Sequence, residues 1–324
     1  MNFCVNIPAA GAPFGEYCRS LFIGDYNGVS PARVIRNFEP EEGKARFKRW
    51  TNIKEVWDDK KKEWVEDEDH RVARYYIRKG HDAFVGGDGA GLELRMLTHY
   101  LIWVCKMRLA NAKSREAKKK FQAALESAYE YRRVLLEDDI HSHNQKLAGL
   151  PTRKAAKGFI YAFLYGAGDA KLAELVSGTS KDGKRLRQTF LKECPCIPLL
   201  IEWAQEQSEK GWLPAIDGRK LIMRRDFRGE VMTHKALNTL LQAAGSIVMK
   251  YSGVFLDNWI KRDKVEANEV IMMHDEYQFS CKWEHVPLLR EHIDSCVSAA
   301  GKCLKMECPL ASDSMLGSSW LETH

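Results

Sequence analysis

The sequence lacks long apolar stretches and the other marks of a membrane or exported protein. No run approaches the roughly eighteen consecutive apolar residues that a transmembrane helix needs. The opening segment, MNFCVNIPAAGAP, has neither the basic start nor the apolar core of a signal peptide. No internal repeat or low-complexity tract is present. These absences exclude a membrane role and predict a folded cytoplasmic protein.

The cysteines also lack a metal-binding pattern. There are nine, with no pair of CxxC elements and no histidine spaced to complete a zinc site. An odd, scattered set is typical of reduced intracellular thiols. Cys194 and Cys196 form a CPC element, which we interpret as turn residues.

The composition itself is that of a folded protein with a slight basic excess. Its 324 residues are 45% hydrophobic and 10% aromatic, enough to bury a core in two or three lobes. Fifty Lys and Arg against 44 Asp and Glu give a net charge of +6, which weakly favours a polyanionic partner. A mildly basic metabolic enzyme is the commoner explanation of such a charge.

Periodicity predicts a mainly helical chain with short strands. VWDDKKKEWV has Val and Trp mirrored about a polar centre, which predicts an exposed hairpin within a charged insertion at about 24–80. EVIMMHDEYQFSC predicts a second hairpin with its HDE residues at the bend. Helices are predicted at 91–136 (with a Lys-rich interruption at 113–120, either an exposed helix side or a loop), 152–175, 184–210, 233–261 and 285–300.

Acidic residues follow two of the apolar runs. Asp88 ends AFVGGD, where glycines allow close backbone approach and the carboxylate could be a hard oxygen ligand. Asp275 and Glu276 form a second pair beside His274. A strand-end Asp is more often a turn or cap residue, and an isolated HDE is common by chance.

Four residues spaced by four lie on one side of a predicted helix. Arg153, Lys157, Tyr161 and Tyr165 drift by only about 40° per step, so they form one stripe about 18 Å long. Two cations followed by two phenols suit a nucleoside triphosphate. The alternative is a solvated basic turn followed by core aromatics.

A later helix carries two amides at the same spacing. Asn238 and Gln242 can meet the minor-groove acceptors that every base pair shares, which would check geometry without sequence preference. The alternative is a pair of half-buried amides whose hydrogen bonds are satisfied within the protein.

Taken in order, these segments resemble the motifs of family A DNA polymerases. DGAGLELR resembles the first palm motif, RKAAKGFIYAFLYGAG the fingers helix, and MHDEYQFSC the second palm motif. DIHSHNQ and ALNTLLQAAG are similar to the short-tailed-phage branch, which would place the protein in the host cytoplasm. VNIPAAGAPFGEYCRSLF resembles the NIP segment, before which the family carries a thumb and an exonuclease-like domain.

The resemblance implies an α+β, predominantly helical fold. We expect a polymerase palm, an antiparallel sheet backed by helices, plus helical fingers, with thumb and exonuclease domains absent. The expected divisions are palm at 1–140, including the inserted charged hairpin, fingers at 141–230, and the rest of the palm at 231–324. A second polypeptide would supply the thumb and the 3′–5′ exonuclease.

The resemblance also implies residue roles in template-directed addition of dNTPs to a primer 3′-hydroxyl. Two Mg²⁺ ions, with Mn²⁺ as a possible substitute, would be held by Asp88 and Asp275 with the Gly89 carbonyl, while Glu276 supports catalysis. The triphosphate would be held by His141, Arg153 and Lys157. Glu93 would be the steric gate against a 2′-hydroxyl, Tyr161 would stack on the base, and Tyr165 would complete the nucleotide site. Asn238, Gln242 and His274 would contact the primer–template DNA.

Two other interpretations stay open. Single-chain phage RNA polymerases have a similar fingers helix but usually lack both the gate Glu and the Glu after His-Asp. A non-catalytic nucleic-acid-binding relic would retain the fold, yet binding alone does not require the carboxylates together with Lys157 and Tyr161.

Overall fold

In the computed structural model the chain divides into two compact units. The structure describes residues 22–23, 45–47, 53–58, 60–71, 75–76, 81, 83–317 and 320–323. The first unit comprises the described parts of Met1–Ala90, Tyr251–Ala300 and Ala311–His324, and the second comprises Gly91–Lys250 and Gly301–Leu310. Each unit is described by itself.

A four-stranded antiparallel sheet is the framework of the first unit. Six of seven positions in β6 and all six in β10 are buried, so these inner strands are covered on both faces. The strand order is β11-β6-β10-β9. The strands are β6 (Ala83–Gly89), β9 (Ala267–Met273), β10 (Glu276–Cys281) and β11 (Ser312–Gly317).

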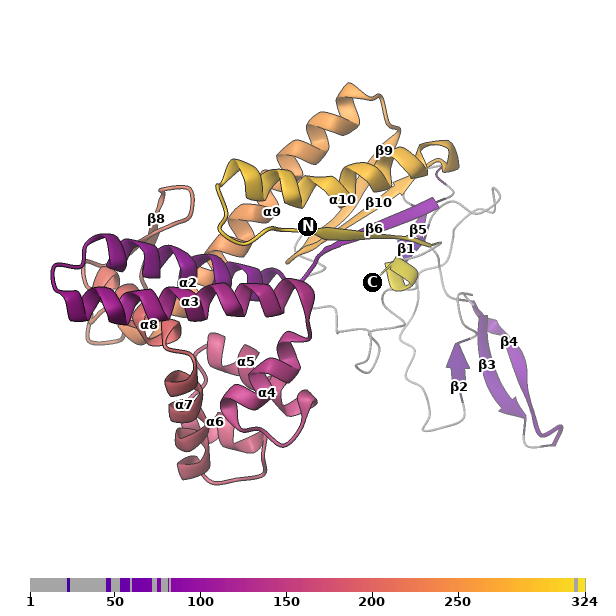
Figure 1. Ribbon diagram of the computed structural model, residues 1–324. Coiled ribbons are helices and arrows are strands. Elements are labelled where there is room, and N and C mark those ends of the chain that lie inside the picture. The colour runs from indigo at the N-terminus through magenta and orange to yellow at the C-terminus, as the bar shows by residue number, and fades with distance from the viewer. Residues whose placement is uncertain are drawn as a thin grey trace. The chain divides into compact units, whose positions relative to one another are not determined.

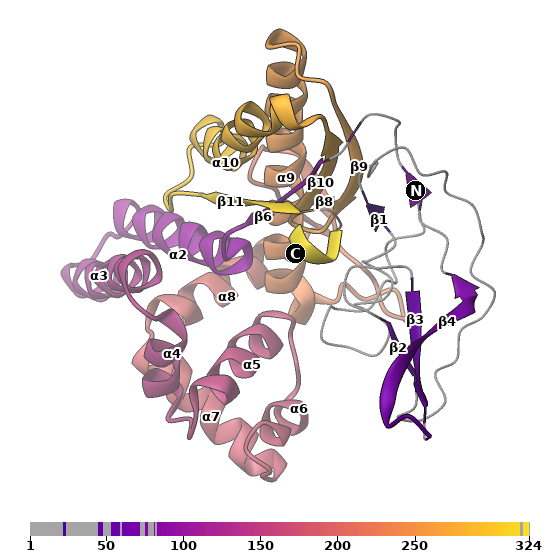
Figure 2. The same ribbon diagram turned by 90° about the vertical axis from the view of Figure 1, so that its right-hand side faces the viewer.

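Two helices cover one face of this sheet. They are α10 (Val286–Cys303) and the C-terminal half of α9 (Ala236–Arg262), which lie on the same side in Figures 1 and 2. The Tyr277 hydroxyl of β10 hydrogen-bonds the Ser252 hydroxyl of α9 at 2.8 Å. A Cβ on Gly87 would collide with Ile293 of α10. Glycine at this position therefore lets the helix approach the strand closely.

The opposite face is closed by the short 3-10 helix η4 (Trp320–Thr323). Trp320 is fully buried and packs with Phe84 and Ile271. A Cβ on Gly86 would collide with Gln278 and with the backbone of Thr323. The two glycines before Asp88 thus permit close packing on both faces of β6.

The predicted β9–β10 hairpin is present, but its bend is shorter than predicted, because Glu276 is already the first residue of β10. His274 and Asp275 form the turn, and His274 has a φ of 55°, in the left-handed region that histidine tolerates better than most side chains.

The charged insertion contains the other predicted hairpin. Trp57 pairs with Trp64, and Val56 with Val65, in the register of β3 (Ile53–Asp58) and β4 (Glu63–Arg71). β2 (Ala45–Phe47) adds to this sheet, and β1 (Phe22–Ile23) pairs in parallel with β5 (Tyr75–Tyr76). The NIP segment and the rest of 1–21 lie outside the described residues.

The second unit is built mainly of helices. α2 (Leu92–Ala110) packs against α3 (Arg115–Glu137) and α8 (Cys196–Ser208). The other helices are α4 (Ile140–Ala148), α5 (Arg153–Leu164), α6 (Asp169–Glu174) and α7 (Ser180–Glu193), with the 3-10 turns η2 (Thr233–Lys235) and, in the other unit, η3 (Trp283–His285). β7 (Trp212–Pro214) and β8 (Lys220–Ile222) form a small hairpin.

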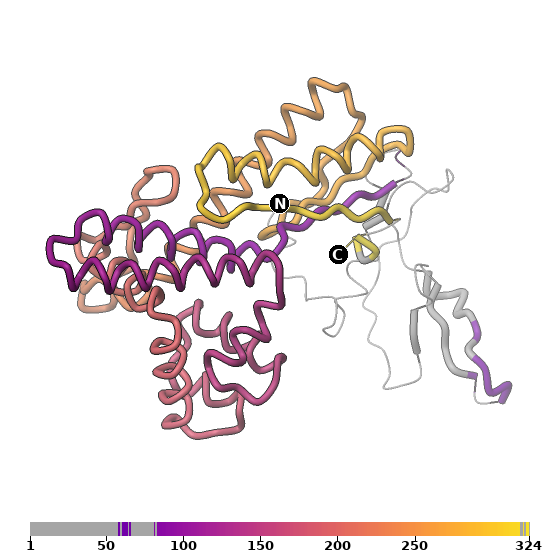
Figure 3. Tube along the Cα trace, viewed as in Figure 1, coloured from indigo at the N-terminus to yellow at the C-terminus, as the bar shows by residue number. Residues whose placement is uncertain are grey.

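Helix ends refine the sequence predictions. The predicted helix at 91–136 is two helices, because Ser114 starts α3 by accepting a hydrogen bond from the Ala117 backbone N–H at 3.1 Å. The Lys-rich interruption is therefore mostly the exposed start of α3. The block at 152–175 is also two helices, α5 and α6, separated at Gly166, whose φ is 77°. Figure 3 traces this path.

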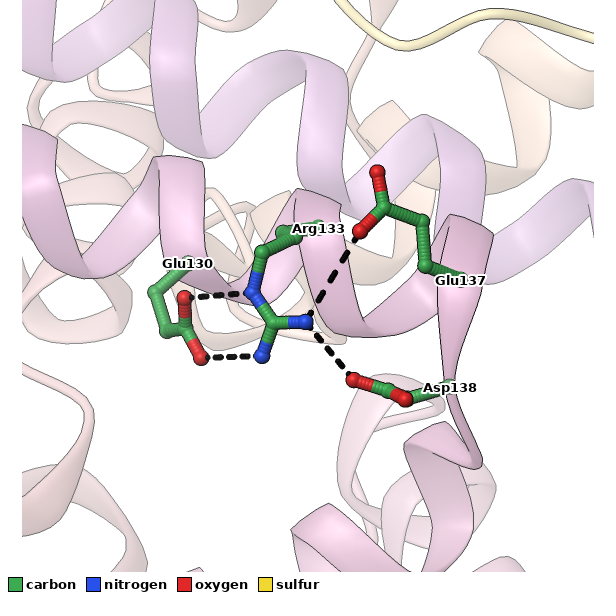
Figure 4. A network of polar contacts seen from close by, with 4 residues as sticks. All are labelled: Glu130, Arg133, Glu137 and Asp138. Carbon is green, nitrogen blue, oxygen red and sulfur yellow. Dashed lines mark hydrogen bonds and ion pairs between the residues drawn. The ribbon is translucent and has the colours of Figure 1, made fainter.

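The C-terminal end of α3 carries an arginine-centred network (Figure 4). Arg133 donates to both carboxylate oxygens of Glu130, at 2.8 and 2.9 Å, and to Asp138 at 2.8 Å, and Glu137 lies 3.8 Å away. Glu137 and the C-cap Asp138 place two carboxylates at the helix C-terminus, where they oppose the helix dipole, and the guanidinium offsets that repulsion.

The described residues show the state of the cysteines and the apolar character of the helices. Every cysteine in this part of the chain has a free thiol, and Cys194 and Cys196 are buried with their Sγ atoms 3.5 Å apart. No helix in the same residues is long and apolar enough to cross a bilayer.

Candidate active site

Three segments distant in sequence bring acidic residues to one end of the sheet. Asp88 pairs in register with Glu276 across β6 and β10. Beside this pair, the Gly89 backbone N–H donates to the Asp275 carbonyl at 2.9 Å. Asp88 is exposed and Asp275 is half-buried. Asp88, at the end of β6, and Asp275, in the turn before β10, are therefore close in the fold although the sequence separates them by 187 positions (275 minus 88).

A third acidic residue, Asp313, was missed by sequence reasoning. It lies directly opposite Asp88 in the β11–β6 register and is exposed. Directly opposed residues in antiparallel strands share a face, so Asp313, Asp88 and Glu276 form a row across the sheet. The only sequence signal was alternation in SDSMLG, which does not reveal a partner strand.

Glu276 is held differently from its two neighbours in the row. It is only 4% exposed, and its Oε1 accepts hydrogen bonds from the Trp320 indole N–H and the Gln278 amide, each at 2.5 Å. The Gln278 Oε1 in turn accepts from the Thr323 hydroxyl at 2.6 Å. Glu276 is thus fixed within the protein, whereas the Asp88 side chain faces solvent.

In the second unit, Asp139 joins the start of α4 to the start of α5. Its carboxylate accepts from Arg153 Nε at 2.6 Å and Nη2 at 3.0 Å. It also accepts from the His141 backbone N–H at 3.1 Å and the Ser142 hydroxyl at 2.6 Å, which caps α4. The Arg153 guanidinium holds the pKa of Asp139 well below its usual range.

His141 is the half-buried member of this group. Burial, followed by the charges of Arg153 and Lys157, lowers the pKa of its imidazole, and Asp139 opposes the shift. Its Nδ1 atom is buried and makes no hydrogen bond within the described residues. A neutral imidazole with an unsatisfied nitrogen beside two cations is suited to an anionic ligand.

The aromatic half of the stripe leads to Glu93. The Tyr161 ring centroid is 6.2 Å from that of His141. Tyr165 lies one residue past the end of α5, because that helix ends at Leu164, and its hydroxyl donates to Glu93 at 3.1 Å. The stripe therefore extends from Arg153 past the helix end, and its last member contacts the first turn of α2.

The two amides lie on α9. Asn238 is half-buried, and its Oδ1 atom has no hydrogen-bond partner within the described residues, while Gln242 is exposed one turn later. His274 is exposed at the β9–β10 turn of the first unit. The sheet residues and the stripe belong to different units, so their assembly into one site stays a prediction.

The end of β6 and the adjoining β9–β10 turn are compatible with a magnesium site completed by substrate. Among the described residues, no group of three or more His, Cys, Asp or Glu side chains is gathered closely enough to hold a metal by itself. Mg²⁺ usually takes one or two protein carboxylates and completes its shell with water and substrate phosphates. An exposed Asp88 beside Asp275 meets that requirement.

Comparisons with known proteins agree with this architecture. The DNA-directed DNA polymerase of Escherichia phage Phieco32 is 51% identical over 99% of this chain and 52% of its own length. The DNA-directed DNA polymerases of Enterobacteria phage T3 and Escherichia phage T7 are 32% and 31% identical over 74% of this chain and 33% of their own lengths. The chain thus spans about half the length of the first relative and a third of the other two.

A solved structure shares the fold, and a family model covers most of the chain. The POL domain of Pol1 from M. smegmatis, in complex with DNA primer-template and dNTP, superposes with a TM-score of 0.61 at 17% identity, over 76% of this chain and 41% of that one. The predicted α+β, mainly helical polymerase fold is confirmed. The model described as DNA polymerase family A matches residues 65–322. The chain belongs to DNA polymerase family A.

Proposed function

We propose that the chain is the catalytic part of a DNA-directed DNA polymerase, which adds deoxynucleotides to a primer 3′-hydroxyl under the direction of a template. The observation that carries the proposal is the junction of β6 with the β9–β10 turn. There the Gly89 N–H donates to the Asp275 carbonyl, and Asp88 stands at the exposed strand end.

Asp88 and Asp275, with the Gly89 carbonyl, are the residues that would hold two Mg²⁺ ions, or Mn²⁺ in their place. Family A polymerases use divalent metals. When bound, such ions supply Lewis acidity to the primer hydroxyl and charge neutralisation to the departing pyrophosphate. Glu276 supports this end of the sheet from within, since its two hydrogen bonds fix the strand that follows Asp275.

The fingers residues would bind the incoming nucleotide. Arg153, Lys157 and His141 offer two cations and an imidazole to the triphosphate, and the charge effects on His141 support their proximity. Tyr161 would stack on the base. Glu93, restrained by Tyr165, would exclude a 2′-hydroxyl, which favours deoxynucleotides over ribonucleotides.

Asn238, Gln242 and His274 would contact the primer–template DNA. The unsatisfied Asn238 amide oxygen and the exposed Gln242 support this, because the minor groove offers both acceptors and, at G·C pairs, a donor. We assign palm to 1–140 and 231–324 and fingers to 141–230.

Processive synthesis would require a thumb and a 3′–5′ exonuclease from a second polypeptide. A fully processive, monodisperse enzyme made from this chain alone would contradict the requirement.

Primer extension tests the function, with labelled primer, Mg²⁺ and dNTPs, with and without candidate partner proteins. Asp88→Ala and Asp275→Ala should each lower the rate by about a thousandfold or more, since metal-held charge contributes several kcal/mol to the barrier. Asp257→Ala is the control, because that aspartate is exposed on α9 and forms an ion pair with Lys261. Full extension by either site variant would refute the assignment. Tight DNA binding without extension in any mixture would favour the non-catalytic relic.

A further inference from the structure

An exposed aromatic side chain stands at the tip of a basic turn in the second unit. The basic turn, defined as residues 224–231, follows strand β8 and carries Arg224, Arg225 and Arg228. Phe227 at its tip is 91% exposed. A lone exposed apolar residue needs no explanation. Phe227 differs from such a residue because hydrogen bonds order the turn that carries it and because positively charged side chains surround it.

The basic turn is held by its own hydrogen bonds. The Asp226 carboxylate accepts from the backbone N–H groups of Arg228 and Glu230, both at 2.9 Å. The Asp226 N–H donates to the Glu230 carbonyl at 2.9 Å, and Arg225 bridges to Val231. Phe227 is therefore presented to solvent by an ordered turn, and a ligand would not have to order that backbone on binding.

The surrounding charge is concentrated and mostly unneutralised. Residues 210–235 contain seven lysines and arginines against three acidic residues, a net charge of +4 in a chain whose total is +6. All seven cations are exposed. Within the described residues, only Arg219 of this segment forms an ion pair, with Asp217. The segment is therefore a locally basic, exposed surface.

Phe227 also has a face available for stacking. The Arg228 guanidinium lies 5.2 Å from its ring centroid, which accounts for one face of the ring. A cation-flanked aromatic of this kind is the element by which single-strand-binding proteins hold unpaired bases. Base pairs of a duplex interior are not accessible to such a ring.

We propose that the basic turn binds single-stranded DNA, with Phe227 stacking on an unpaired base and its arginines contacting the adjacent phosphates. The inference rests on the proposed function only in identifying the bound DNA as the unpaired part of the template. Binding itself requires no polymerisation.

The test measures DNA binding by the full chain. Fluorescence anisotropy gives the affinity for a dye-labelled single-stranded oligodeoxynucleotide and for a blunt duplex of the same sequence. Phe227→Ala should weaken single-strand binding about fivefold or more and leave duplex binding nearly unchanged. An oligonucleotide containing 2-aminopurine should lose stacking-induced quenching with Phe227→Ala and retain it with Phe227→Trp. Ile222→Ala is the matched control, because Ile222 is an exposed apolar side chain, 76% accessible, just outside the turn.

The cations are tested by salt dependence. Replacing Arg224 and Arg228 by Gln should reduce the slope of log affinity against log salt by about 0.7 for each charge removed. The control replaces the exposed Lys118 and Lys119 of α3 by Gln. It removes the same number of positive charges and should change the slope less.

Three outcomes would overturn the inference. The first is single-strand affinity that falls no further in Phe227→Ala than in Ile222→Ala. The second is an equal loss of affinity for single strand and duplex. The third is full quenching of 2-aminopurine by Phe227→Leu, which would show that binding needs no aromatic ring. Failure of primer extension together with Phe227-dependent binding would defeat the proposed function and leave this inference standing.

Discussion

Asp139 makes contacts that stability alone does not explain. Its pair with Arg153 is exposed, with 40% and 57% of the two side chains accessible, and exposed ion pairs stabilise proteins little. The carboxylate occupies Nε and one hydrogen of Nη2, which leaves three of the five guanidinium N–H donors for another ligand. The pair therefore orients Arg153 without using up its donors.

Asp139→Asn separates this orienting role from helix capping. Asparagine caps a helix as well as aspartate does, so α4 should persist while the charged pair is lost. We expect KM for dNTPs to rise about two- to tenfold with kcat and the melting temperature little changed, because Arg153 must then be ordered during binding. Steady-state kinetics measure this, and Glu130→Gln, which breaks the bidentate pair with Arg133 (Figure 4), is the control. A fall in KM would show instead that Asp139 competes with the triphosphate.

At the scale of elements, the contact between α2 and the end of α5 concerns sugar selection. The Tyr165 hydroxyl restrains Glu93 in the first turn of α2. Glu93→Ala should lower the ratio of kcat/KM for dNTPs over rNTPs by about a hundredfold, the scale on which pockets discriminate one hydroxyl. Tyr165→Phe should have a smaller effect in the same direction. Single-nucleotide incorporation measures both, and Glu116→Ala, which removes the first-turn acid of α3, is the control. Unchanged discrimination in Glu93→Ala would remove the gate assignment.

Local signals predicted most elements and few of the contacts between them. The spacing of Arg153 and Lys157, the glycines before Asp88 and the mirrored tryptophans all express periodicity or turn chemistry within about ten residues. The helix ends required caps such as Ser114, which a periodic pattern does not locate. Asp313 escaped notice because its partner Asp88 lies 225 positions away (313 minus 88), and strand register is fixed by the folded sheet.

The same distinction applies to the candidate site. Asp88 and Asp275 could be chosen from the sequence because each ends or interrupts an apolar run. The sequence could not show whether the Glu276 side chain is buried or exposed, because its burial depends on Trp320 and Gln278. Asp139 was likewise not singled out from the sequence, because its pairing with Arg153 requires two helices to meet.

At the scale of the whole molecule, stability should depend on a buried histidine. His99 of α2 is 5% exposed, and its Nδ1 accepts a hydrogen bond from the Glu307 backbone N–H at 3.0 Å. Burial lowers the pKa of its imidazole from 6.5 to about 4, and the Glu307 charge only partly opposes this. Protonation would place a charge in the core and remove the acceptor that joins α2 to the segment after α10.

The sign of the pH effect follows from proton binding in the two states. Between pH 6.5 and about 4 the unfolded chain binds more protons at His99 than the folded chain, so the stabilisation is complete above pH 6.5 and is lost as the pH falls toward 4. At about 1.36 kcal/mol per pH unit, the loss approaches about 3 kcal/mol. Urea unfolding compared at about pH 7.5 and about pH 5 should show a loss of about 2 kcal/mol, because that interval includes about 1.5 pH units below the unfolded pKa of about 6.5.

His99→Gln keeps a side-chain acceptor and removes the titration, so its unfolding free energy should change less over the same interval. His234→Gln, at an exposed histidine, should retain the wild-type dependence. If His99→Gln lost as much stability as the wild type, carboxylates elsewhere would account for the acid sensitivity. If it lost much less, one buried imidazole in the helical unit would set the lower pH limit of the folded molecule.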